Sequence, residues 1–198
     1  MHQIDFSQLP TRDAYKFLTG VVIPRPIAWV TTLSDNGEVN AAPFSFFNVF
    51  GSNPPIVVIG TGRRPEGALK DTAHNLKERK LAVIHLVEPD FGPAMSATAT
   101  ALPHGESEIT HAKLELEPSE DFEVPSIKGT LLRLQARLMD QPVYGQNLLN
   151  VLELIRAEIA PGLWDAERGY VSADFAPIGR LAGNGYCTSS DRFEMERP

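Results

Sequence analysis

The chain has 198 residues, of which 42% are hydrophobic and 22% charged, and this composition excludes the disordered and fibrous classes and allows a full hydrophobic core. The formal net charge of −7 argues against a general binder of nucleic acid or membrane surfaces, because neutralising phosphates requires a clustered basic face. Since no internal repeat and no linker-like stretch divides the sequence, we expect one domain over residues 1–198.

The cysteine content and the N-terminal residues point to a reducing compartment. The single cysteine, Cys187, cannot form an intrachain disulfide, and its simplest role is that of a small hydrophobe. The first residues have neither a basic start nor an apolar run, and no stretch approaches the roughly 18 apolar residues of a membrane span. We therefore expect a cytoplasmic protein that does not contact membranes.

The first predicted elements, in chain order, are a lead-in and a strand. Residues 1–20 are polar, and we expect a short helical turn there at most. Pro24 and Pro26 then restrict the backbone on both sides of Arg25, which places this arginine on a stiff, extended segment. Residues 27–33 follow as a strand rich in β-formers.

A hairpin continues this strand. Residues 35–37, Asp-Asn-Gly, supply the left-handed positions of a tight turn, and residues 40–48 form the return strand. Pro43 lacks a backbone N–H, so we expect it at a sheet edge or at a bulge. A bulge would turn Ser45 and Asn48 out of the regular alternation and into a cleft.

The next segment combines a buried strand, a basic loop and a helix. Residues 56–59 are short and β-branched, as in a buried strand, and residues 69–80 have helical character. The glycines of the loop 60–67 have the spacing of a P-loop, but residues 68–69, Ala-Leu, stand where its lysine and hydroxyl are required, so we exclude that motif. The loop and helix start carry three cations: Arg63, Arg64 and Lys70.

The remaining elements are mostly strands. Residues 81–87 are a short apolar strand, and residues 132–138 alternate apolar and polar side chains, the pattern of a half-buried strand. Between them, residues 103–129 form a polar surface excursion with one short helix around 107–114. Residues 147–159 fit a helical spacing and nearly fit a strand, and periodicity alone favours a helix.

Hydrolytic chemistry is not indicated. The histidines are scattered over unlike segments, no His-Glu-x-x-His helix occurs, and the pair His104 and His111 in the polar excursion is a weak metal candidate, so we expect no metal site. No Gly-x-Ser-x-Gly nucleophile motif occurs either.

A bound flavin mononucleotide (FMN) suits the hairpin and the basic helix start together. Its phosphate is best met by hydroxyls, backbone N–H groups and a cation at a helix start, which Thr31, Thr32, Lys70 and Thr72 offer. Its ring system needs an apolar binding surface with polar contacts at the edge. Trp29, Phe44 and Phe46 offer the apolar surface, and Ser45 and Asn48 the polar contacts. Each residue alone is explained more simply as core or β-propensity, and only their combination favours the flavin. Hydride transfer is the cofactor's own chemistry, at flavin N5, so we expect no catalytic side chain.

At these residues the chain resembles the flavin reductase-like, or flavoredoxin-like, FMN-binding split barrels. The resemblance rests on residues 24–32 (PRPIAWVTT), 40–48 (NAAPFSFFN), 54–55 (PP) and 70–75 (KDTAHN), with a weaker match at 177–183 (PIGRLAG). It covers most of the chain.

The resemblance implies a mainly β protein with short helices, a six-stranded antiparallel split β-barrel of Greek-key type. It also implies a homodimer with FMN near the subunit interface. For residues 149–159 it implies a strand, which we expect in place of a helix because tertiary context often overrides short-range periodicity. By position it implies flavin contacts at nine residues: Arg25, Thr31, Asn40, Ala42, Ser45, Phe46, Asn48, Lys70 and Thr72. We add Trp29 to this set as a tenth.

Two functions follow as expectations. In the first, FMN takes hydride from NADH or NADPH and passes electrons to free flavin or another acceptor. In the second, a flavoredoxin-like carrier shuttles electrons between proteins through FMN without its own NAD(P)H turnover. Flavin binding without a redox role is a third, weaker alternative.

Ser96 stands where relatives often carry Asn, which affects a polar contact to the flavin or the partner chain.

Overall fold

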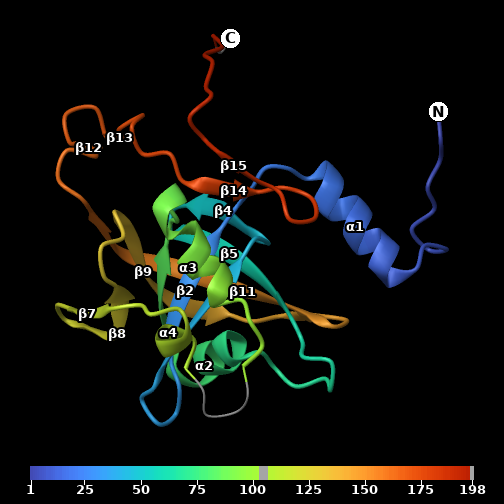
Figure 1. Cartoon of the computed structure of the whole chain (residues 1–198), viewed down its shortest axis with the longest axis horizontal. Helices are drawn as coiled ribbons and strands as arrows, with labels where there is room; N and C mark the ends of the chain where they lie inside the picture. The colour runs from blue at the N-terminus through green and yellow to red at the C-terminus, as the bar shows by residue number, and fades with distance from the viewer. Residues whose placement is uncertain (103–106, 197–198) are drawn as a thin grey trace.

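The computed structural model describes residues 1–102 and 107–196, and its main feature is one curled antiparallel sheet (Figure 1). Its neighbouring strands are, in spatial order, β3 (Val39–Phe44), β2 (Ala28–Leu33), β6 (Leu81–His85), β9 (Leu132–Asp140), β11 (Asn147–Ile159), β5 (Pro55–Gly62) and β4 (Phe47–Ser52), with β10 (Val143–Tyr144) beside β11. The predicted mainly β, antiparallel split barrel is confirmed, with eight strands in this sheet rather than six.

The two edges of the sheet are consecutive in the chain. The edge strands β3 and β4 are joined through Ser45 and Phe46, so the chain crosses from one edge of the curled sheet to the other within two residues. The backbone N–H of Gly60 donates to the carbonyl of Phe46 at 2.7 Å, and an added Cβ at Gly60 would lie 3.1 Å from that of Phe46. This bond continues the β4–β5 pairing by one residue, so the short turn that joins the two edges is held against β5.

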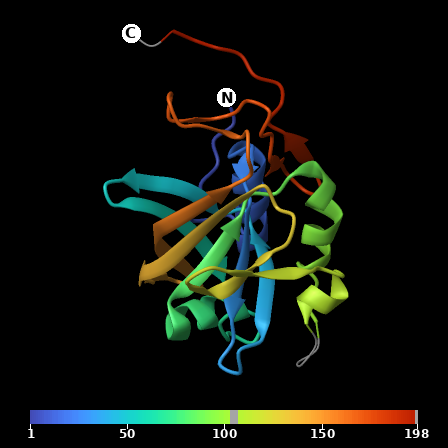
Figure 2. The same ribbon diagram turned by 90° about the vertical axis from the view of Figure 1, so that its left-hand side faces the viewer.

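The inner face of the sheet holds the main core. Alternate residues of β2 and β3 point inward, among them Ala28, Val30 and Phe44, which pack with Leu152 of the long strand β11. Helix α2 (Asp71–Arg79) packs on β2, β3 and β6 and contributes Leu76 to this core (Figure 2). The start of α2 therefore lies beside the edge strand β3.

The outer face of β2 is covered by a second apolar cluster. Trp29 packs there with Met95 of α3 (Gly92–Ala97) and with Ile127 of β8 (Phe122–Ile127). Phe91 of the 3₁₀ turn η1 (Pro89–Phe91) and Leu116 of strand β7 (Leu116–Ser119) also pack on this cluster, and helix α4 (Glu108–His111) contacts β3. The predicted helix around 107–114 is thus confirmed as α4, while the β7–β8 hairpin was not predicted.

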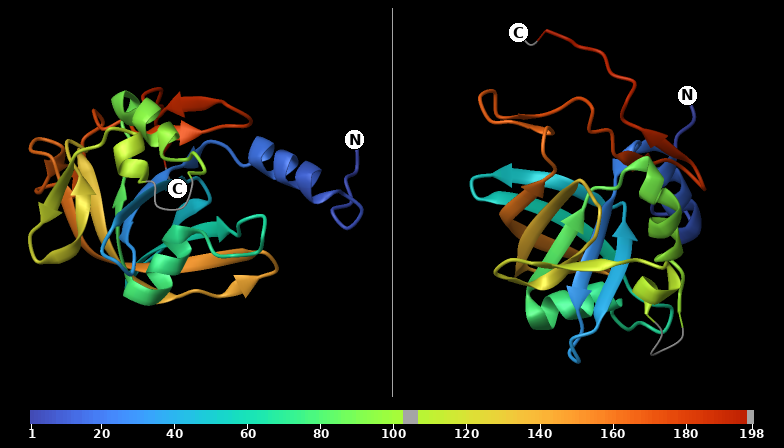
Figure 3. Two further views of the ribbon diagram at one scale, coloured as in Figure 1. Left: turned by 60° about the horizontal axis from the view of Figure 1, so that its bottom comes forward. Right: turned by 60° about the vertical axis from the view of Figure 1, so that its left-hand side comes forward.

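Smaller sheets and the first helix complete the structure. The strands β1 (Arg25–Pro26), β14 (Ile178–Arg180) and β15 (Tyr186–Thr188) form a three-stranded sheet, and β12 (Trp164–Asp165) pairs with β13 (Tyr170–Val171). Helix α1 (Thr11–Val21) extends away from the barrel (Figure 3). In the ranges 1–102 and 107–196, no helix has the length and apolar character needed to cross a membrane.

One expectation about these elements was wrong, and two are confirmed at least in part. The lead-in forms the 11-residue helix α1 rather than a short turn, because its apolar residues fall on one helical face. Periodicity alone favoured a helix for residues 147–159, but the strand expected from the family resemblance is confirmed as β11, since β5 and β9 pair with both of its edges. Pro43 lies on an edge strand as predicted, but the β2–β3 register is continuous, so no bulge forms there.

Candidate functional site

The start of helix α2 is one end of the candidate site. Its N-cap, Lys70, makes no side-chain cap, so backbone N–H groups of the first turn keep their partial positive charge. The Lys70 side chain is exposed, and its Nζ lies 5.8 Å from the ring centre of Phe44, at the end of β3. A helix start and a free ammonium group together suit a phosphate.

Two buried polar pairs fix this helix start against the sheet. Asn40 Nδ2 donates to Thr72 Oγ1 at 2.9 Å, and Asn75 Nδ2 donates to Thr32 Oγ1 at 3.0 Å. The structure therefore brings the predicted residues Asn40 and Thr72 together, with their side chains bonded to each other.

A cavity of about 530 Å³ lies at the C-terminal end of β3, around Pro43 and Ser45. It is lined by Tyr15, Ile27, Pro43, Ser45, Met95, Ser96, Ala99, Arg180, Asn184 and Tyr186. Of the ten predicted flavin contacts, Ser45 is the one in this lining. The cavity combines apolar side chains with hydroxyl, amide and guanidinium groups, the mixture that small-molecule sites commonly have.

Arg25 lies behind Ser45 and is bonded within the protein. Its Nη1 donates to the carbonyls of Thr19 at 2.7 Å and Val22 at 3.1 Å, and its Nη2 donates to the carbonyl of Leu181 at 3.2 Å. Its Nε donates to Ser45 Oγ at 3.4 Å. The guanidinium joins the end of α1, the β14–β15 hairpin and the cavity wall, so a direct ligand contact would require it to exchange these bonds.

Trp29 and Thr31 lie under the surface of the site. Both are 0% exposed. Trp29 Nε1 donates to Thr98 Oγ1, and Thr31 Oγ1 donates to the carbonyl of Pro125, each at 2.9 Å. The Trp29 side chain is therefore a core residue, and it packs against the cavity residue Met95.

The other predicted contacts lie near β3 and the start of β4. Ala42 is half-buried and packs on the inner core. Phe46 is 47% exposed, with its ring centre 6.2 Å from that of Tyr15. Asn48 is exposed, and its Oδ1 accepts a bond from the N–H of Val49. These residues follow the edge of the sheet rather than gathering around one point.

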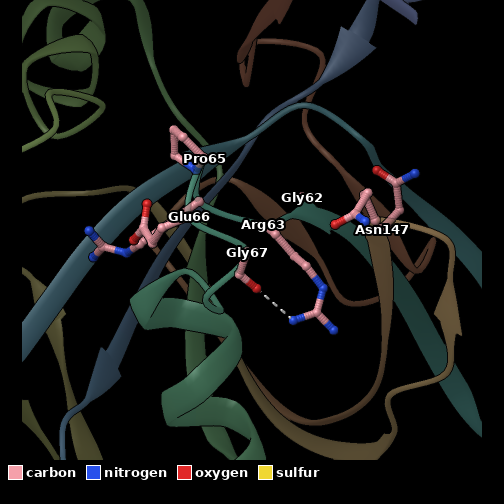
Figure 4. Close-up of a pocket in the computed structure, with 8 residues that line it drawn as sticks. Gly62, Arg63, Pro65, Glu66, Gly67 and Asn147 are labelled. Carbon is pink, nitrogen blue, oxygen red and sulfur yellow. Dashed lines mark hydrogen bonds between the residues drawn. The ribbon is translucent and has the colours of Figure 1, made fainter.

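A second hollow lies in the basic loop between β5 and α2 (Figure 4). Its volume is about 550 Å³, and it contains none of the ten predicted contacts. Arg63 Nη1 donates to the carbonyl of Gly67 at 3.0 Å, and Arg64 forms an ion pair with Asp71. Both arginines thus make contacts within this loop and helix start, whereas Lys70 has no ion pair with a described residue.

Two ionisable groups near the site have shifted pKa values. Burial raises the pKa of Glu108, and the nearby charge of Asp71 raises it further. Burial lowers the pKa of His85 to about 4, even though a bond to the carbonyl of Trp29 favours the charged form. Since His85 Nε2 accepts the N–H of Ile127 at 3.0 Å, the neutral ring carries its proton on Nδ1, which donates to Trp29.

No metal centre is present in the part of the chain that the structure describes, where no group of three or more His, Cys, Asp or Glu side chains converges. His104, half of the weak metal candidate of the sequence, lies outside the described residues.

The sequence did not single out Arg180 and Tyr186, which line the cavity together with Ser96. The signal available for Arg180 was the motif at residues 177–183, in which it is the central charged residue. Tyr186 lies beyond that motif, and it reaches the cavity because β15 pairs back onto β14.

Comparison with known proteins identifies the family. YwrF of Bacillus subtilis (strain 168) is 39% identical over 206 residues, with 100% of each chain covered. The structure of nitrilotriacetate monooxygenase component B from Bacillus cereus superposes with a TM-score of 0.93 at 35% identity, covering 98% of each chain. That of the 2-nitrobenzoate 2-nitroreductase NbaA of Pseudomonas fluorescens gives 0.90 at 32% identity, covering 100% of this chain and 96% of the other. Residues 20–174 match the flavin reductase like domain, and the chain belongs to this family.

Proposed function

We propose that this chain is an FMN-binding oxidoreductase that takes hydride from NADH or NADPH and passes electrons to free flavin or another acceptor. The observation that carries the proposal is the position of the edge strand β3. It runs from Asn40, which is bonded to Thr72 in the first turn of α2, to the cavity at Ser45, so one strand connects the proposed phosphate end with the proposed ring end. Membership of the flavin reductase like family supports the same conclusion.

At the phosphate end, the residues present fit the group. The N–H groups at the uncapped start of α2 would donate to the phosphate, and Lys70 would supply the balancing charge. Thr72 Oγ1 already accepts the bond from Asn40, so its own hydrogen remains for a phosphate oxygen. These three kinds of donor are what a dianion requires.

At the ring end, the cavity and the sheet edge fit a flavin ring. Within the described ranges, one side of the β3 backbone has no neighbouring strand, and the N–H and C=O groups of such a sheet edge match the polar edge of a flavin. Pro43 and Ile27 would give the apolar surface and Ser45 a polar contact. Bound FMN would supply hydride transfer, while these residues hold it and exclude water.

The predicted contacts divide by role in this proposal. Lys70 is exposed at the helix start, Ser45 lines the cavity, and Ala42, Phe46 and Asn48 follow the edge of the sheet. Thr72 is 2% exposed, and its hydroxyl would be the part of it that reaches the phosphate. The buried side chains would support the groove from behind: Arg25, Trp29, Thr31 and Asn40.

We also propose that the active form is a homodimer with FMN near the subunit interface. Helix α1 extends from the barrel with Leu18 46% exposed and Val21 57% exposed, and Phe46 and Phe50 are exposed on the neighbouring segment. A second copy that covers these apolar side chains would also close the groove beside Phe46.

The expected compartment remains the cytoplasm, on the basis of the single Cys187.

Stopped-flow mixing of FMN-loaded protein with NADH and with NADPH tests the function. Loss of the oxidised flavin absorbance within milliseconds to seconds is the expected result, and the faster nucleotide is the donor. If the absorbance persists with both nucleotides but disappears with a reduced protein donor, the electron-carrier alternative replaces the oxidoreductase.

Replacing Lys70 by Glu is expected to weaken FMN binding by about 10- to 100-fold, because a charge-assisted contact worth about 1.5–3 kcal/mol is lost. Riboflavin, which has no phosphate, should bind with unchanged affinity. The control is Lys77→Glu, the same charge change in the last turn of α2. Fluorescence titration measures all the affinities, and equal FMN affinity of wild type and Lys70→Glu would show that Lys70 faces solvent.

A further inference from the structure

The cavity at Ser45 has two walls of different origin. One wall comes from α1, the residue between β1 and β2, β3 and the turn after it, and it carries Ile27, Pro43 and Ser45, to which we assign the flavin. The facing wall comes from α3, the residues after it and the β14–β15 hairpin: Met95, Ser96, Ala99, Arg180, Asn184 and Tyr186. None of these six is among the proposed flavin contacts, so the facing wall has no assigned ligand.

The charge of the cavity is unusual for this chain. The protein has a net charge of −7, but the cavity lining contains Arg180 and no Asp or Glu. The ion pairs among the described residues do not include Arg180. Its positive charge is therefore uncompensated by a neighbouring carboxylate, and in a concave, partly apolar space such a charge attracts anions.

The guanidinium is also held in place. Arg180 Cζ lies 4.4 Å from the ring centre of Tyr186, and Nη2 donates to the carbonyl of Gly183. Gly183 has the left-handed φ of +57° that the hairpin turn needs, and Arg25 Nη2 binds the adjacent carbonyl of Leu181. A guanidinium fixed by stacking keeps its other N–H groups available for paired bonds to a carboxylate or phosphate.

We propose that Arg180, stacked on Tyr186, recognises an anionic group of the second substrate on the wall facing the flavin contacts. The inference rests on the proposed function. The ligand class is a small planar molecule with a carboxylate or phosphate: its ring lies against the apolar residues of the cavity, and its anionic oxygens bind the guanidinium. The anion belongs either to the pyrophosphate of the nicotinamide donor or to a carboxylate of the acceptor.

Arg180→Gln tests the assignment, with two readouts for the two sources of the anion. In the first, the dissociation constant of NADH is measured by the concentration dependence of flavin reduction, beside that of the uncharged donor 1-benzyl-1,4-dihydronicotinamide. In the second, calorimetry measures the binding of benzoate and of uncharged benzamide to FMN-loaded protein. Arg192→Gln is the matched control, because Arg192 binds the carbonyls of Ser189 and Phe175 away from the cavity.

We expect Arg180→Gln to weaken the binding of one charged ligand by about 10-fold or more, the size of a lost charge-assisted contact. The affinities for the uncharged ligands and for FMN should not change. Weaker binding of NADH would assign the anionic group to the pyrophosphate of the donor. Weaker binding of benzoate would assign it to a carboxylate of the acceptor. Tyr186→Phe, which keeps the stacking ring, should bind like wild type, whereas Tyr186→Leu should weaken the same ligand as Arg180→Gln.

The failures of the two proposals are distinguishable. Wild-type protein that takes up no FMN overturns the proposed function and this inference with it. Wild-type protein that binds FMN and is reduced by NADH, with unchanged constants for both charged ligands in Arg180→Gln, overturns the inference alone.

Discussion

Replacing Arg25 by Met is expected to lower the free energy of unfolding by about 2–4 kcal/mol, because the buried carbonyl of Thr19 and the partly buried carbonyls of Val22 and Leu181 lose the donors they now share. Arg25 is 6% exposed, so water cannot readily replace those donors. Methionine has a similar length and fills much of the same space, so the loss reports the hydrogen bonds more than a cavity. Urea unfolding measures the change.

The control for Arg25 lies on helix α1. Arg12→Met removes the same charge from an exposed position, and its effect should stay within about 0.5 kcal/mol of zero. Because Arg25 ties the β14–β15 hairpin to the cavity wall, Arg25→Met should also weaken FMN binding. An Arg25→Met variant as stable as the Arg12→Met variant would contradict the structural role and favour an arginine that is free to bind the cofactor directly.

The second large effect is a loss of stability in mild acid, caused by His85. The unfolded chain binds a proton on this histidine near its ordinary pKa of 6.5, whereas burial lowers the pKa in the folded chain to about 4. Between these values the unfolded state binds more protons, so stability falls as pH falls. The difference corresponds to about 3 kcal/mol lost between pH 7 and pH 4.

His85→Gln isolates this contribution. Glutamine can donate to the carbonyl of Trp29 and accept from the N–H of Ile127, as the neutral imidazole does, but it does not titrate. Glu88 and Glu108, whose pKa values are raised by burial, act in the opposite direction in both proteins, since a raised carboxyl pKa favours the folded state as pH falls. Urea unfolding at a series of pH values should therefore show a flatter profile for His85→Gln. Parallel profiles would exclude His85 as the source.

Most of the barrel could be predicted from local pattern. The Asp-Asn-Gly turn predicted the β2–β3 hairpin, and alternation predicted β9. Residues 147–159 could not be settled in this way, because their strand depends on pairing with β5 and β9, which lie far away in sequence. Helix α1 was missed because the polar composition of residues 1–20 was given more weight than the helical spacing of its apolar residues, which fall on one face.

The candidate site was predictable in its elements rather than in its side-chain contacts. The motifs placed it on β3 and the start of α2, where the structure has the uncapped helix and the cavity. Residue type alone could not show that Arg25 and Trp29 face inward, since their bonds reach Leu181 and Thr98, which are remote in sequence. Arg180 and Tyr186 were out of reach for the same reason, because strand pairing in the C-terminal sheet brings them to the cavity.

A fluorescence titration of FMN and riboflavin with the wild-type protein tests the central claim most directly. The groove along β3 is proposed to hold a ring at one end and a phosphate at the other. We therefore predict saturable quenching by FMN, stoichiometric with the chain, and weaker binding of riboflavin. No saturable binding of FMN would contradict the flavin site, and equal affinities for the two flavins would contradict the phosphate position at the start of α2.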